Sequence, residues 1–110
     1  MAVGTTTSGA EEIAKLATGA RVVEALPVFA EVLSSTSRKF GELDPTVFYC
    51  GNDAEAKAIV AGLLHEIEVE AIDAGPLRNA RYIEPAMMLL VQLAYAQGMG
   101  GAIALKLLRR

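Results

Sequence analysis

Apolar and polar residues follow two different periods along this chain, and the change of period marks the predicted elements. Short β-branched or alternating runs predict three strands, at 21–26, 46–50 and 69–73. Apolar residues spaced three or four positions apart predict helices at 9–18, 27–33, 53–67, 77–96 and 102–110. Because strands alternate with helices, the pattern predicts an α/β fold with a small, mainly parallel sheet of about three strands and flanking helices.

Local signals support several of these boundaries. Ser8 followed by Glu11 is a capping box, which predicts a helix start at this point. Asp53 is a suitable N-cap for the third helix. Pro85 removes one backbone donor, so we expect the long helix to bend there. The glycine-rich stretch 97–101 breaks that helix and separates it from the last one.

The long helix is apolar on nearly all sides over 85–96, unlike a surface helix with a single apolar stripe. Its apolar side chains are Met87, Met88, Leu89, Leu90, Val91, Leu93 and Tyr95. Three short strands and the remaining helices cannot cover it in a chain that is 53% hydrophobic. We therefore expect a homodimer, joined through this helix and the C-terminal helix at 102–110.

Length, charge and cysteine content argue against a nucleic-acid-binding protein and against a membrane protein. The 110 residues predict one domain, 1–110, and the net charge of −3 offers no basic footprint for nucleic acid. The most apolar run, 85–96, is shorter than the roughly 20 residues of a membrane span. With no signal-peptide pattern and only Cys50, which cannot form an internal disulfide, we expect a cytoplasmic protein that does not bind a membrane.

Few side chains suggest chemistry by themselves. Arg78 and Arg81 lie one turn apart at a helix start and could bind an anion, although Asp73 and Glu84 could instead neutralise them as ion pairs. His65 is the only histidine, and with no second histidine or nearby thiol it predicts no metal site. Cys50 ends an apolar strand and is interpreted as a core residue.

Three segments carry a resemblance to a known family. They are Phe48 to Lys57 (FYCGNDAEAK), Asp73 to Arg81 (DAGPLRNAR) and Gln97 to Gly100 (QGMG), and they occur in the family's order. On these segments the chain resembles the C-terminal half of the NADP oxidoreductases that use a deazaflavin coenzyme. It is also similar to the cytosolic reductase domain of the six-transmembrane metalloreductases.

The resemblance implies NADP and a deazaflavin or flavin as the family's cofactors. It also implies a ring pocket lined by Leu26, Pro27, Val28, Phe29, Gly98, Met99 and Gly100. The glycine-rich turn that holds the pyrophosphate in a Rossmann half is absent from this sequence, so we expect no cofactor to be bound by this chain alone. Pro27 stands where family members carry a polar pair beside the reacting rings.

Three functions remain open on this evidence. The chain could be the pocket-and-dimerisation half of an NADP(H)-dependent oxidoreductase, unable to bind NADP alone. It could be a stand-alone homodimer that binds, cyclises or isomerises an apolar small molecule without redox chemistry, or a structural dimerisation module. The sequence leaves open whether the chain is itself an enzyme; the candidate catalytic groups are Glu24, Tyr49, Tyr82, Glu84 and Tyr95.

Overall fold

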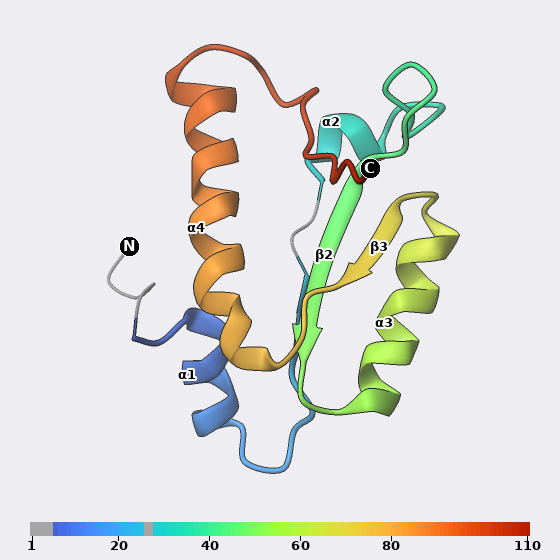
Figure 1. The fold of residues 1–110 in the computed structure, drawn as a ribbon. Coiled ribbons are helices and arrows are strands. Elements are labelled where there is room, and N and C mark those ends of the chain that lie inside the picture. The colour runs from blue at the N-terminus through green and yellow to red at the C-terminus, as the bar shows by residue number, and fades with distance from the viewer. Residues whose placement is uncertain (1–5, 26–27) are drawn as a thin grey trace.

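A three-stranded sheet organises the chain in a computed structural model that describes residues 6–25 and 28–110 (Figure 1). The strands are β1 (Val23–Ala25), β2 (Thr46–Gly51) and β3 (Glu70–Asp73), in the order β1-β2-β3. β2 and β3 are parallel, whereas β1 is antiparallel to β2. The α/β class is confirmed, but the sheet is mixed, so the prediction of a mainly parallel sheet holds for only one of its two strand pairs.

The direction of β1 follows from the short helix after it. A parallel connection needs a crossover that returns along the sheet, usually a helix of a dozen or more residues. The helix α2 (Ala30–Leu33) has 4 residues and rises only about 6 Å at 1.5 Å per residue. The chain therefore stays near the end of the sheet where β1 finishes, and β2 begins at that same end.

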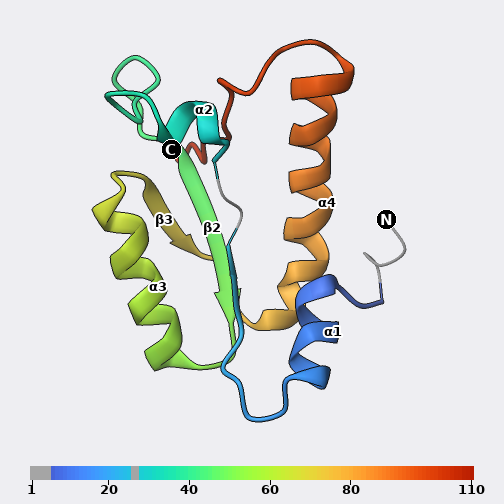
Figure 2. The ribbon, with the colours of Figure 1, turned by 180° about the vertical axis from the view of Figure 1, so that it is seen from behind.

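Helices cover the two faces of the sheet differently. α1 (Gly9–Leu16) and α4 (Ala80–Val91) lie side by side on one side, and α3 (Ala54–Glu66) lies on the other (Figures 1 and 2). A short 3₁₀ turn, η1 (Leu77–Asn79), leads into α4, and a π-helical turn, η2 (Gln92–Ala96), extends it. Within the described residues no helix is long and apolar enough to span a bilayer.

The last nine residues correct the sequence prediction. No helix forms over 102–110; this segment lies against the start of β2, where the Leu105 carbonyl accepts a hydrogen bond from the Thr46 amide at 2.8 Å (Figure 1). Gly98 and Gly100 have φ of 77° and 78°, which glycine adopts without strain, and they sit where the chain leaves α4. Burial of Ile103 and Leu105 against the sheet outweighs the helical spacing of this segment.

Two apolar clusters form the core, one on each face of the sheet. The first contains Cys50 with residues of α1 and α4, and the second contains Val47 with Val28, Val32 and Val69. The helical stripe predicted on α3 is only partly inward, since Ile59, Leu63 and Ile67 are 57%, 57% and 40% exposed. This helix therefore leaves an apolar face in solvent.

The exposed surface is large for the size of the chain. It measures 7017 Å² for 11.6 kDa, whereas the usual scaling for a folded monomer of this mass gives roughly 5,800 Å². The Cα radius of gyration is 14.4 Å, against about 13 Å expected for this length. The folded chain therefore exposes more surface than a typical monomer of its mass.

Candidate functional site

The segment from Asp73 to Arg81, hereafter the signature turn, is built by its own polar side chains. The Asp73 carboxylate accepts the Gly75 amide at 2.8 Å, and the Asn79 side-chain amide donates to the Ala74 carbonyl at 2.6 Å. Gly75 has φ of 98°, and a Cβ there would lie 2.9 Å from the Asn79 amide nitrogen. The backbone conformation therefore favours glycine at this position, and a Cβ would also displace the Asn79 amide that donates to Ala74.

The second family-like segment, Phe48 to Lys57, is hydrogen-bonded to this turn. The Asn52 side-chain oxygen accepts the Leu77 amide at 3.0 Å, and the Gly51 amide donates to the Gly75 carbonyl at 3.1 Å. Lys57 reaches Asp73 at 2.9 Å. The Gly75 amide and then the Lys57 ammonium hold the pKa of the Asp73 carboxyl below its usual range. These motif residues shape the scaffold.

The signature turn forms one wall of an apolar pocket. The pocket has a volume of about 270 Å³ and lies between β2, the turn and α4. Its lining residues are Phe48, Ala74, Asn79, Tyr82, Ile83 and Ala86. Only Asn79 and Tyr82 bring polar atoms, and Asn79 already donates to Ala74. This pocket is suited to an apolar or aromatic group oriented by few hydrogen bonds.

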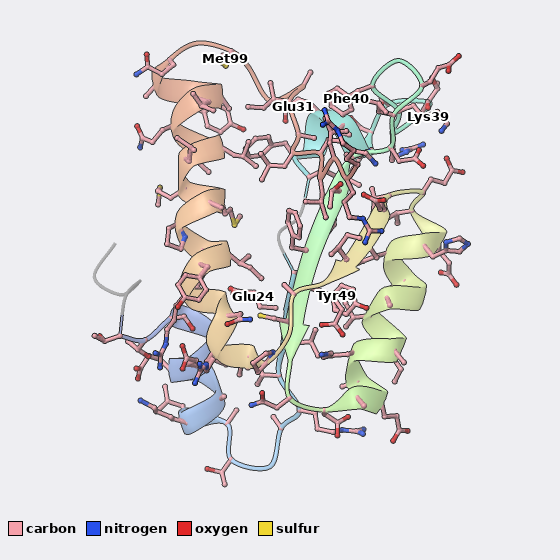
Figure 3. All side chains as sticks on the ribbon, viewed as in Figure 1. Glu24, Glu31, Lys39, Phe40, Tyr49 and Met99 are labelled. Atoms are coloured by element: carbon pink, nitrogen blue, oxygen red, sulfur yellow. The ribbon has the colours of Figure 1, made fainter. Side chains whose placement is uncertain are left out.

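Two candidate catalytic residues, Glu24 and Glu84, meet on the α4 side of the sheet, and we call them the acid pair. Glu24 lies opposite Cys50 in the β1–β2 register, so both side chains project from the same face. Figure 3 places Glu24 between the sheet and α4. Burial, then the hydrogen bond with Glu84 and the repulsion from its charge, raise the pKa of Glu24 to about 8.

Glu84 is held differently from Glu24. Its two carboxylate oxygens accept the Gly9 and Ala10 amides at 2.8 and 3.1 Å, at the N-terminus of α1. Burial by itself raises the pKa of Glu84, but the hydrogen bonds from Glu24, Gly9 and Ala10 outweigh burial, so the pKa lies below its usual range. Glu84 is therefore the ionised member of the acid pair at neutral pH.

The three tyrosine candidates do not join this pair. Tyr49 lies opposite Ala25 and alternates with Phe48 and Cys50 along β2, so it projects from the other face of the sheet. Tyr82 is 72% exposed at the pocket. The Tyr95 ring contacts Phe29 edge-on, with ring centroids 5.9 Å apart. The structure thus brings together only two of the five candidates.

The predicted ring-pocket residues are dispersed. Leu26 and Pro27 lie outside the described residues. Val28 is buried in the cluster with Val47, on the face of the sheet away from α4. Gly98, Met99 and Gly100 are exposed in the turn after α4. Phe29 contacts the helix extension η2 through Tyr95. The Met99 and Gly100 amides also reach η2, where they donate to the Leu93 and Ala94 carbonyls at 3.1 and 2.8 Å.

Arg81 pairs with a carboxylate other than the two expected from the sequence. Arg81 forms a two-point ion pair with Glu11 of α1, at 2.8 and 2.9 Å, while Asp73 pairs with Lys57 and Glu84 binds backbone amides. Arg78 is exposed. An anion at this helix start would have to compete with Glu11 for Arg81.

Cys50 agrees with its interpretation as a core residue. Cys50 is fully buried, its thiol donates to the Leu77 carbonyl at 3.8 Å, and burial, followed by the Glu24 charge, raises its pKa to about 11. It is therefore a poor nucleophile. His65 is exposed, and the described ranges contain no group of three side chains that could bind a metal.

Sequence reasoning named Glu24 and Glu84 separately and missed that they form a pair. The available signal was Glu24 itself, a carboxylate within the apolar run Val22 to Leu26. A charged side chain in such a strand usually has a hydrogen-bonding or ion-pair partner. No local sequence pattern could identify that partner as Glu84, because it lies 60 positions further along the chain.

Comparisons with known proteins agree with this architecture. No protein-family profile matches the chain. The F420-dependent NADP reductase of Methanocaldococcus jannaschii is 44% identical over 52 residues, which are 46% of this chain and 23% of that protein. A crystal structure from Arthrobacter sp. FB24, provisionally assigned as an F420-dependent NADP reductase, superposes with a TM-score of 0.81 and 34% identity.

That superposition covers 96% of this chain and 47% of the Arthrobacter chain, so the protein spans about half the length of its structural relative. The resemblance predicted from the three sequence segments is confirmed by both comparisons. In sequence and in fold, this chain is related to the F420-dependent NADP reductases and corresponds to the C-terminal part of such a protein.

Proposed function

We propose that this chain forms the pocket and the dimer contact of an NADP-dependent oxidoreductase that uses a deazaflavin coenzyme. The observation that carries the proposal is the structural match over 96% of the chain to a relative assigned as an F420-dependent NADP reductase. The apolar pocket beside the signature turn supports it, because hydride transfer between two ring systems depends on positioning more than on an acid or base.

In this proposal the residues of the pocket position the coenzyme ring. Phe48, Ile83 and Ala86 provide apolar walls, and Tyr82 lies at the pocket with most of its ring in solvent. The nucleotide-binding half would come from another polypeptide segment, since the glycine-rich turn of a Rossmann half is absent from this sequence.

The dimer contact is proposed on the outer face of α4. This face carries Tyr82, Met88 and Leu89, which are 72%, 42% and 59% exposed, and Tyr95 follows on η2 at 63%. The surface in excess of a typical monomer is about 1,200 Å², and one partner of a standard interface buries about 800 Å². A second copy of the chain could therefore cover most of the excess.

The isolated chain is expected not to bind NADP(H) in the micromolar range. Its sequence has no glycine-rich turn between a strand and a helix of the kind that holds a pyrophosphate, and Arg81 is engaged by Glu11. Calorimetric titration with NADP and NADPH checks this expectation. A micromolar dissociation constant that is lost in Arg78→Ala would show instead that the signature turn is a phosphate site.

Filling the pocket is expected to weaken coenzyme binding. The missing pyrophosphate turn concerns NADP, so we now restrict the expectation that this chain alone binds no cofactor to NADP, and we propose that F420 binds in the pocket. Ala86→Trp places a large ring in a space of about 270 Å³ and should reduce the affinity for F420 at least tenfold, measured by fluorescence titration. Ala58→Trp on the exposed side of α3 is the matched control and should bind as the wild type does. Equal binding by both variants would place the coenzyme elsewhere.

Ala86 is a better position for a bulky substitution than Val28, which the family resemblance suggested as a pocket residue. Val28 is 8% exposed and packs with Val32, Val47 and Val69, so a bulky residue there overpacks the core. Loss of ligand binding in Val28→Trp would not separate binding from folding.

A second candidate function is the binding of an apolar small molecule without redox chemistry. The small number of polar atoms in the pocket favours it. If a hydrophobic fluorescent dye binds the wild type, Ala86→Trp abolishes this binding and F420 does not compete, this second function is supported over the first.

A further inference from the structure

Three elements meet at the acid pair. Glu24 comes from β1, Glu84 comes from α4, and the Gly9 and Ala10 amides that bind Glu84 form the first turn of α1. The Glu24 oxygen Oε2 is sealed from solvent and accepts no hydrogen bond from the described residues. Two ionised carboxylates in contact at such a position would repel each other, and one sealed oxygen would lack a donor.

We propose that Glu24 and Glu84 share one proton. Binding of this proton stabilises the packing of β1 and α4 against the N-terminus of α1, and this stabilisation depends on pH. The proton resides on Glu24, which donates it to Glu84. A single proton removes both problems. It neutralises one of the two negative charges, and it allows the Glu24 carboxyl to donate a hydrogen bond to the Glu84 carboxylate.

The surrounding groups assign the proton to Glu24. Two backbone amides stabilise the negative charge of Glu84, whereas the Cys50 thiol beside Glu24 donates to the Leu77 carbonyl and not to the carboxyl. Of the nearby cations, Lys57 is paired with Asp73 and Arg81 with Glu11. The charge of Glu11 adds to the negative field at Glu84.

The sign of the pH dependence follows from the Glu24 pKa. The value is about 8 in the folded chain and 4.5 for an ordinary glutamate. Between these values the folded chain keeps a proton that the unfolded chain has released, so the folding equilibrium constant falls up to tenfold per pH unit. The stabilisation is complete below pH 4.5, declines through this window and is lost above about pH 8, where both carboxyls are ionised.

The test compares the pH dependence of stability in matched variants. Urea unfolding from pH 5 to 9 is measured for the wild type, Glu24→Gln and the exposed control Glu55→Gln, whose side chain is 79% exposed. The side-chain amide introduced by Glu24→Gln can donate to Glu84 at every pH. Glu24→Gln should therefore abolish the decline between pH 5 and 8, while Glu55→Gln should keep it. An unchanged decline in Glu24→Gln overturns the proposal.

A second measurement needs no variant. Carboxyl-carbon NMR of the wild type should show one glutamate that titrates more than two pH units above the others, and in the same range the Gly9 and Ala10 amide resonances should shift. Titration of every glutamate near its ordinary value would also overturn the proposal. Neither measurement uses the coenzyme, and the urea experiments compare all variants at one protein concentration. A failure of the proposed function and a failure of the shared proton can therefore be distinguished.

Discussion

Leu90→Arg is expected to unfold the protein, whereas Leu89→Arg is expected to leave it folded. The two leucines are neighbours on α4, yet Leu90 is 6% exposed in the cluster around Cys50 and Leu89 is 59% exposed. An unpaired charge buried by the first substitution costs about 3–5 kcal/mol. That cost reaches the lower end of the stability of a folded domain, which is about 5–15 kcal/mol, and the lost apolar packing of Leu90 adds to it.

Circular dichroism with urea unfolding at pH 6 separates the two variants. Leu90→Arg should have lost its cooperative transition, and Leu89→Arg should keep the helical signal of the wild type. Equal stability of the two variants would mean that α4 is rotated about its axis relative to the structure described above, because the packing of the helix assigns opposite environments to these adjacent positions.

The wild-type protein is expected to sediment at about twice 11.6 kDa, and Leu89→Arg is expected to sediment as a folded monomer. The reason is the outer face of α4 and η2, which exposes the large side chains of Tyr82, Met88, Leu89 and Tyr95. An arginine placed at the centre of an apolar contact loses its hydration without gaining a partner. Analytical ultracentrifugation at micromolar concentration measures both masses.

Ile59→Arg is the matched control, since Ile59 is exposed to nearly the same extent on the apolar face of α3. It should leave the dimer intact. If Ile59→Arg dissociates the dimer and Leu89→Arg does not, the copies associate through α3 and the proposed interface is wrong. If the wild-type protein remains a folded monomer at these concentrations, the prediction of a homodimer is wrong.

The amino-acid sequence by itself determined the three strands, the approximate positions of the helices before residue 97, and the starts of α1 and α3. Ser8 and Asp53 were predicted as helix N-caps and accept the Glu11 and Ala56 amides at 3.1 and 2.8 Å. Both contacts span three positions, so the information lies within one turn of chain. The three strands and the family resemblance were likewise predictable, because β-branched runs and motif spacing are local properties.

Only the tertiary structure decided the direction of β1, the course of the C-terminal segment and the partners of the charged groups. Ile103 and Leu105 form an extended segment because the sheet offers them a place in the core, which their helical spacing could not reveal. The Glu11–Arg81 pair and the acid pair each join residues at least 60 positions apart. Such contacts depend on how the elements pack, and packing is a property of the whole chain that no local pattern records.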